Sequence, residues 1–223
     1  MARKAVKSTR MDIIRAATGM FLEKGYSATS PRAISDALHI STGNLTYHFQ
    51  TKEHLLAVLV EMLCDFQWQV MQGVVHQGHT SLLAVCLELS AMAAICEEDE
   101  IARDFYLSSY SHPLTLEIIR QNDCKRSRLV YGQFCPHWKE EDFIAAEILV
   151  SGIEYATLMP AGDTVPLERR ITGAINTILT TYHVPETLRK EVIGEVLAGD
   201  YRAIGKQFLT GFKSYVEQVN DKK

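Results

Sequence analysis

The sequence has few residues that break helices and no pattern that is typical of strands. Its 223 residues include 6 prolines and 13 glycines, and no run of Val, Ile or Thr alternates with polar residues. A half-buried strand needs that alternation, whereas helices repeat their apolar residues every three or four positions. We therefore expect an all-helical chain.

The sequence also lacks a long uninterrupted apolar run. The two longest apolar stretches, 81–96 and 143–159, each contain Glu and are shorter than a membrane-spanning helix. The first ten residues, MARKAVKSTR, have no apolar core, so we expect no signal peptide. Five cysteines without CxxC spacing favour reduced thiols over disulfides. These absences together predict a soluble, cytoplasmic protein.

Positive charge is concentrated at one end of the chain. Residues 1–52 hold eight Lys or Arg against three Asp or Glu, whereas the remainder holds 15 bases against 24 acids. A basic N-terminal part on an acidic body indicates that only the former meets a polyanion. A basic segment with no partner is the alternative, and charge alone does not decide between them.

The basic part contains signals for short, capped helices. The first helix is expected over 9–24, and Ser30 with Pro31 starts a second, because Ser caps helices and Pro fits the first helical position. His39 is expected at positive φ in the following turn. A third helix is expected over 42–49, and Thr51 should cap a fourth.

Two short helices joined by a tight turn are typical of a helix-turn-helix, whose second helix enters the major groove of DNA. Leu45 and Phe49, four residues apart, can anchor this helix, while Gly43 allows close approach to DNA. The remaining outward positions carry side chains that contact bases or phosphates, namely Thr42, Asn44, Thr46, Tyr47 and His48. Lys52 opposes the dipole of its helix, which favours a phosphate bound there over a merely solvated lysine.

Residues 9–56 resemble the DNA-binding domain of the TetR (tetracycline repressor-like) regulators. The matching residues include Phe21, GY at 25–26, TS at 29–30 and the run ISTGNL.YHF.TKE.L. The resemblance implies a DNA-binding domain over 8–68 and a helical ligand-binding and dimerisation domain over 69–223. It adds Arg32 to the expected DNA contacts. His39 and Thr46 depart from the family pattern, which commonly has Gly and Tyr there.

The same resemblance implies a homodimer, usually a repressor, that releases its DNA operator when a small-molecule inducer binds. The inducer would occupy a cavity of the second domain, although aromatic and Met side chains at helical spacing more often form ordinary core. The candidate lining residues are Phe66, Met71, Met92, Cys96, Phe105, Tyr106 and Tyr110. Glu88 lies in an apolar stretch, where it could orient a polar group of the ligand, although a surface position is the stronger expectation.

Later helices are expected near 101–111, 114–134, 139–159, 166–182, 186–198 and 201–219, with Pro and Gly between them. We expect dimerisation through the small residues of 143–159 and an Ile stripe within 166–182, paired as a four-helix bundle. That stripe consists of Ile171, Ile175, Ile178 and Tyr182. Packing of both helices inside the monomer is the alternative.

The sequence contains no catalytic constellation, and its His and Cys spacings match no standard metal site. We therefore expect neither an enzyme, a metal nor a cofactor. A chromosome-organising DNA-binding protein without an inducer is the main alternative function, and an enzyme carrying a helix-turn-helix is the weaker one. A cavity in the body would favour the ligand-responsive regulator.

Overall fold

The computed structural model describes residues 2–77, 79–160 and 164–219, with side chains from residue 10 onward. No strand occurs in these ranges, and the all-α class is confirmed. The helices are α1 (Ala2–Lys24), α2 (Pro31–Ala37), α3 (Thr42–His48), α4 (Lys52–His76), α5 (Ser81–Glu98), α6 (Glu100–Ser111), α7 (Pro113–Tyr131), α8 (Glu140–Leu158), α9 (Leu167–Thr181), α10 (Glu186–Ala198) and α11 (Tyr201–Gln218).

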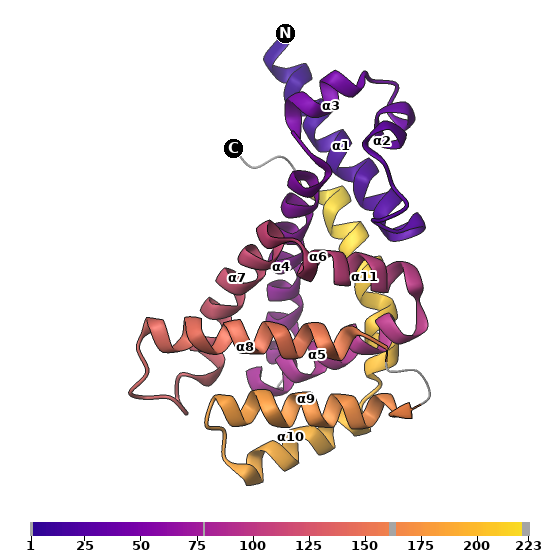
Figure 1. Ribbon diagram of the computed structural model, residues 1–223. Coiled ribbons are helices and arrows are strands. Elements are labelled where there is room, and N and C mark those ends of the chain that lie inside the picture. The colour runs from indigo at the N-terminus through magenta and orange to yellow at the C-terminus, as the bar shows by residue number, and fades with distance from the viewer. Residues whose placement is uncertain (1, 78, 161–163, 220–223) are drawn as a thin grey trace.

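The helices form a small head and a larger body, and α4 runs from one into the other (Figure 1). The head comprises α1, α2, α3 and the first turn of α4. Its core is apolar and buried, with Phe21, Ile34, Leu45 and Phe49 almost fully shielded from solvent. Burial of these side chains holds the two short helices, which are too short to be stable alone.

The expected caps of the head are confirmed. The side chains of Ser30, Ser41 and Thr51 accept hydrogen bonds from the first turns of α2, α3 and α4. His39 adopts φ 53°, as expected for the turn between α2 and α3. A local sequence signal therefore fixes each boundary of the helix-turn-helix.

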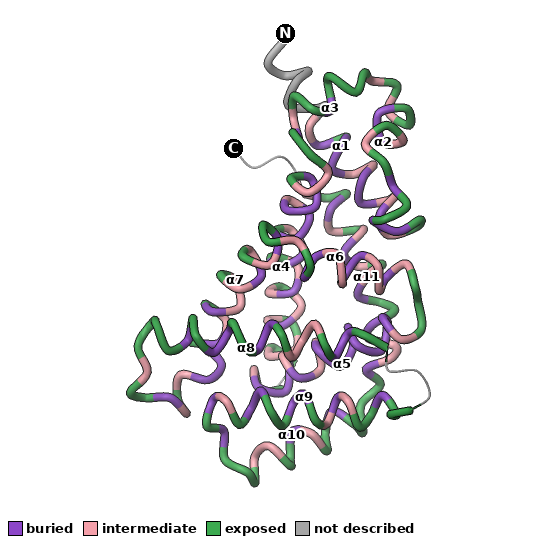
Figure 2. Tube along the Cα trace, viewed as in Figure 1, coloured by how far each residue is buried: buried purple, intermediate pink, exposed green. Residues whose placement is uncertain are grey.

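The body is built around α5, which packs against α4, α6, α8, α9, α10 and α11. Most of its residues from Leu82 to Cys96 are buried, as its uniformly apolar sequence predicts. Buried residues follow the inward faces of the surrounding helices (Figure 2). No helix in the described part of the chain is both long and apolar enough to span a membrane.

Two predictions about the helices are wrong in detail. The first helix begins at Ala2 rather than near Thr9, because residues 2–8 contain no Gly or Pro and continue the helix. The isoleucine stripe of α9 faces the interior of the monomer, where Ile171 and Ile175 are at most 1% exposed. The stripe therefore cannot form a dimer interface.

Candidate functional site

The second helix of the head projects its polar face into solvent. Thr42, Gly43, Asn44 and Thr46 are exposed, and Tyr47 is 76% exposed although its ring is apolar. Leu45 points the other way and is 1% exposed. A fixed buried side and an open outer side are what a helix needs to enter a DNA groove.

Two further predicted residues lie beside this face. His48 is half-buried, and its ring packs edge-on against Tyr47 at 5.2 Å. Arg32 of α2 is exposed, with its guanidinium 3.7 Å from the carboxylate of Asp36. An exposed pair at this distance contributes little, so the guanidinium can readily exchange its partner for a phosphate.

Lys52 makes contacts within the head that its sequence position did not predict. Its ammonium donates hydrogen bonds to the carbonyls of Tyr26 and Thr29, at 2.8 and 3.1 Å, and lies 3.9 Å from the centre of the Tyr26 ring. Partial burial lowers the pKa of this lysine, while Glu53 and Asp104 oppose that shift. The ammonium therefore joins the start of α4 to the loop between α1 and α2, and its contact with a phosphate stays a prediction.

The same loop also contacts the body. The backbone N–H of Ser27 donates to a carboxylate oxygen of Asp104 in α6 at 2.7 Å, and the Ser27 hydroxyl donates to the other oxygen. Gly25, two residues before Ser27, has φ 93°. A Cβ added to Gly25 would lie 2.8 Å from the Asp104 carboxylate. The Tyr26 ring packs edge-on against His112 at the end of α6. Helices α4 and α6 thus both connect the head to the body.

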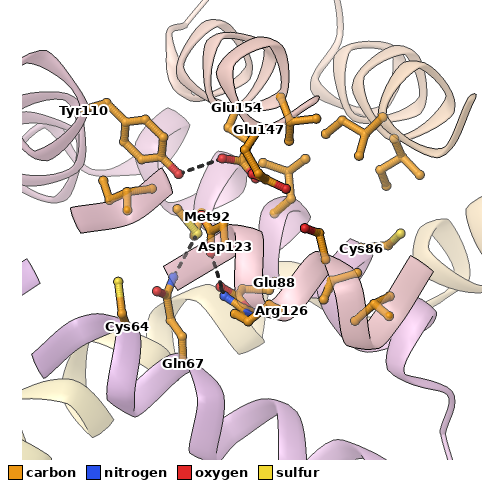
Figure 3. A pocket seen from close by; sticks show the side chains of 18 of the residues that line it. Cys64, Gln67, Cys86, Glu88, Met92, Tyr110, Asp123, Arg126, Glu147 and Glu154 are labelled. Atoms are coloured by element: carbon orange, nitrogen blue, oxygen red, sulfur yellow. Dashed lines mark hydrogen bonds and ion pairs between the residues drawn. The ribbon is translucent and has the colours of Figure 1, made fainter. Parts of the chain in front are cut away.

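The body contains an internal cavity of about 80 Å³ among α4, α5, α6, α7, α8 and α9. Figure 3 shows side chains from these surrounding helices projecting towards it. Apolar residues such as Val60, Leu89, Val150 and Ile175 form much of the wall. A smaller cavity of about 40 Å³ shares Glu88, Met92 and Tyr106 with the first one.

An ion-pair network crosses one wall of the cavity. Arg126 of α7 binds both oxygens of Glu88 in α5, and its Nη1 lies 3.4 Å from the carboxylate of Asp123 (Figure 3). Burial raises the pKa of Asp123 to about 7, although Arg126 opposes this. Glu88 is therefore an internal residue, and its expected surface position is wrong.

Two more carboxyl groups approach the cavity from α8. Glu147 accepts a hydrogen bond from the Tyr182 hydroxyl, and Glu154 accepts one from the Tyr110 hydroxyl at 3.1 Å. Burial raises the pKa of both carboxyl groups, and the charges of Asp123 and Glu147 raise that of Glu154 further. The Tyr106 hydroxyl is buried at the wall and has no hydrogen-bond partner among the described residues.

Only part of the predicted ligand set lines this cavity. Met92, Tyr106 and Tyr110 line it, and Met71 lines the smaller one. Phe66 instead packs against Phe208, Phe212 and Tyr215 of α11, with ring centroids 4.9 to 5.9 Å apart. This contact corrects the expectation that Phe66 faces a ligand.

Cys96 and Phe105 do not border the described cavities either. Both side chains are 0% exposed and belong to the hydrophobic core. Apart from Glu88, the sequence did not reveal the polar wall, which also includes Gln67, Asp123, Arg126, Glu147, Glu154 and Tyr182. Glutamates inside the apolar helices α5 and α8 are the signal that could have revealed it. Charged side chains are rarely buried unless they are paired, so a charge in such a helix indicates a polar partner or site.

The described side chains show no grouping typical of metal or disulfide chemistry. All five cysteines are free and buried. No three His, Cys, Asp or Glu side chains within the described ranges come together as a metal site requires.

The geometry of the head defines a helix-turn-helix protein, the class that inserts its second helix into DNA. Residues 13–59 match the family model described as "Bacterial regulatory proteins, tetR family". This match identifies a tetR-type DNA-binding domain within the head.

Two curated relatives resemble the head region. The HTH-type transcriptional repressor KstR2 of Mycobacterium tuberculosis is 36% identical over 61 residues, which cover 27% of this chain and 30% of the relative. KstR2 of Mycolicibacterium smegmatis is 37% identical over 59 residues, covering 26% and 27%. The match thus spans less than a third of either relative.

The whole chain is similar in fold to TylP, a TetR regulator from Streptomyces fradiae. The two chains are 17% identical, the TM-score is 0.50, and the alignment covers 98% of this chain and 94% of TylP. This likeness extends the shared fold from the head to the body.

Proposed function

We propose that this chain is a sequence-specific transcriptional repressor that a small molecule releases from its DNA operator. The observation that carries the proposal is one continuous structure: an exposed recognition helix and an internal cavity connected through α4 and α6. The curated relatives are repressors, which supports the same direction of control. The proposed domains are residues 8–68 for DNA and 69–223 for ligand and dimerisation.

Within the head, Thr42, Gly43, Asn44, Thr46 and Tyr47 are the proposed groove contacts because they are exposed on one short helix. Asn has the donor and acceptor needed to read adenine, and Thr and Tyr can contact a thymine methyl or a phosphate. Arg32 and His48, which lie beside this helix, are proposed phosphate contacts.

We propose that the repressor is a homodimer joined through α8. The exposed face of this helix is unusually apolar, with Ile148 at 51% and Leu149 at 64% exposed beside Ala145, Gly152 and Ala156. These residues follow one stripe of a helix, and the small ones allow a second helix to approach closely. A dimer would place two heads on successive major grooves, about 34–36 Å apart.

Two connections can transmit the state of the cavity to the head. Helix α4 carries Val60 and Gln67 to the cavity and begins at Lys52, which binds the α1–α2 loop. Helix α6 carries Tyr106 and Tyr110 to the cavity and binds the same loop through Asp104. A ligand that favours one arrangement of these helices would change the spacing of the heads.

Selection from random DNA duplexes followed by affinity measurements tests this function. We expect enrichment of a twofold-symmetric sequence, and we expect Asn44→Ala to cost about 1–3 kcal/mol on that sequence and little on random DNA. Sedimentation of wild type and Leu149→Glu should show a dimer and a monomer, respectively. Absence of any enriched sequence would favour the inducer-independent, chromosome-organising alternative, against which the internal cavity argues.

A further inference from the structure

The cavity wall has an excess of acidic groups. Its lining includes four carboxyl groups, those of Glu88, Asp123, Glu147 and Glu154, but a single basic side chain, that of Arg126. An internal surface of this kind is uncommon, because buried charges are normally paired. The pairing within the wall therefore determines which ligand the cavity can accept.

Arg126 is already committed to one side of the cavity. Its two terminal nitrogens bind Glu88, and one of them also approaches Asp123. Glu147 and Glu154 receive hydrogen bonds from tyrosine hydroxyls instead. The nearby Arg120 of α7 donates to the Ser151 hydroxyl at 2.9 Å and is not part of the lining.

Hydroxyl donors satisfy lone pairs but do not neutralise charge. Two neighbouring carboxyl groups in a poorly solvated site are therefore held protonated or else need a cation. The tyrosine rings that line the same wall add a second attraction, since the face of an aromatic ring attracts cations. The unpartnered Tyr106 hydroxyl can also accept a hydrogen bond.

We propose that the ligand of this cavity is an organic monocation, an ammonium group on an apolar body, whose charge is held by Glu147 and Glu154. This inference rests on the proposed function, since it specifies the inducer. The apolar wall formed by Val60, Leu89, Val150 and Ile175 would receive the body. An anion would meet the carboxyl groups without a free base, and a neutral ligand would leave them protonated and gain nothing from their negative charge.

The experiment compares head groups on one apolar body. Linear alkylamines of four to ten carbons, and the alcohols and carboxylates of the same lengths, are tested for binding to the full chain by calorimetry and thermal unfolding at pH 8. We expect the best amine to bind at least about tenfold more tightly than its matched alcohol, with the carboxylate weakest. Equal or tighter binding of the alcohol or carboxylate at every length would overturn the proposal.

Dependence on pH and on the two glutamates provides the second test. Burial raises the pKa of both carboxyl groups, which must lose protons to pair with the ammonium, so affinity for the amine should rise with pH while that for the alcohol stays constant. Glu154→Gln and Glu147→Gln should each weaken the amine about tenfold and leave the alcohol unaffected. Glu141→Gln, at an exposed position of α8, is the matched control and should change neither.

DNA binding is measured separately, so that the two proposals can fail independently. If an amine binds the cavity without changing affinity for the selected duplex, the cation site is supported and its role in sensing is refuted. If instead a neutral or anionic compound binds the cavity and releases the duplex, the sensing function is supported and the proposal of a cationic ligand is refuted.

Discussion

Replacement of Lys52 by Met separates its role in folding from a role in DNA binding, because the substitution removes the ammonium and keeps most of the apolar stem. The ammonium donates to the carbonyls of Tyr26 and Thr29, and hydrogen bonds from a charged donor contribute about 1.5–3 kcal/mol each. Lys52 is only half-buried, which favours the lower end of this range. For the two bonds together we expect a loss of about 3 kcal/mol in the free energy of unfolding.

The measurements are urea denaturation and the salt dependence of affinity for the selected duplex. A lysine that neutralises one phosphate contributes about 0.9 to the slope of log affinity against log salt. We expect Lys52→Met to leave that slope unchanged. The control, Arg32→Ala, removes an exposed side chain and should lower the slope by about one with less than about 0.5 kcal/mol lost in stability. Unchanged stability with a reduced slope for Lys52→Met would refute the reasoning.

Three other predictions concern stability. Arg126→Met should cost about 3–5 kcal/mol in urea denaturation because Glu88 and Asp123 lose their cation, and adding Glu88→Gln should recover part of this loss. Because burial raises the pKa of Asp123 to about 7, above its unfolded value near 4, the stability it contributes should fall between about pH 4 and 7 as the pH rises. Asp123→Asn should remove this part of the pH dependence, and an unchanged profile would contradict the assignment. Gly25→Ala should cost about 1–3 kcal/mol through its positive φ and the clash with Asp104, whereas Gly19→Ala, in an open helical position, should be neutral or stabilising.

The sequence was most informative where structure depends on neighbouring residues. Ser30, Ser41 and Thr51 were recognisable as caps because each acts on its own helix within three residues. The outward face of α3 followed from the positions of Leu45 and Phe49 in the same way. Local signals therefore revealed the head almost completely.

Long-range contacts account for what the sequence did not reveal. The partners of Lys52 lie 26 and 23 residues before it, so its position in a first turn indicated only that something must offset the helix dipole. The apolar stripe of α9 was visible, but periodicity does not distinguish the monomer core from a partner subunit. Glu147 and Glu154 become notable only once α8 is packed around the cavity with Tyr110 and Tyr182.

The most direct test of the central claim measures affinity for the selected duplex with and without an occupied cavity. The compound used should raise the unfolding temperature of wild type but not that of Val150→Phe, in which a larger side chain fills the cavity. We expect it to weaken operator binding by about 5–150-fold, equivalent to a coupling of 1–3 kcal/mol, and the duplex to weaken its binding by the same factor. Operator affinity that stays the same when this compound saturates the cavity would contradict the claim that the body controls the head.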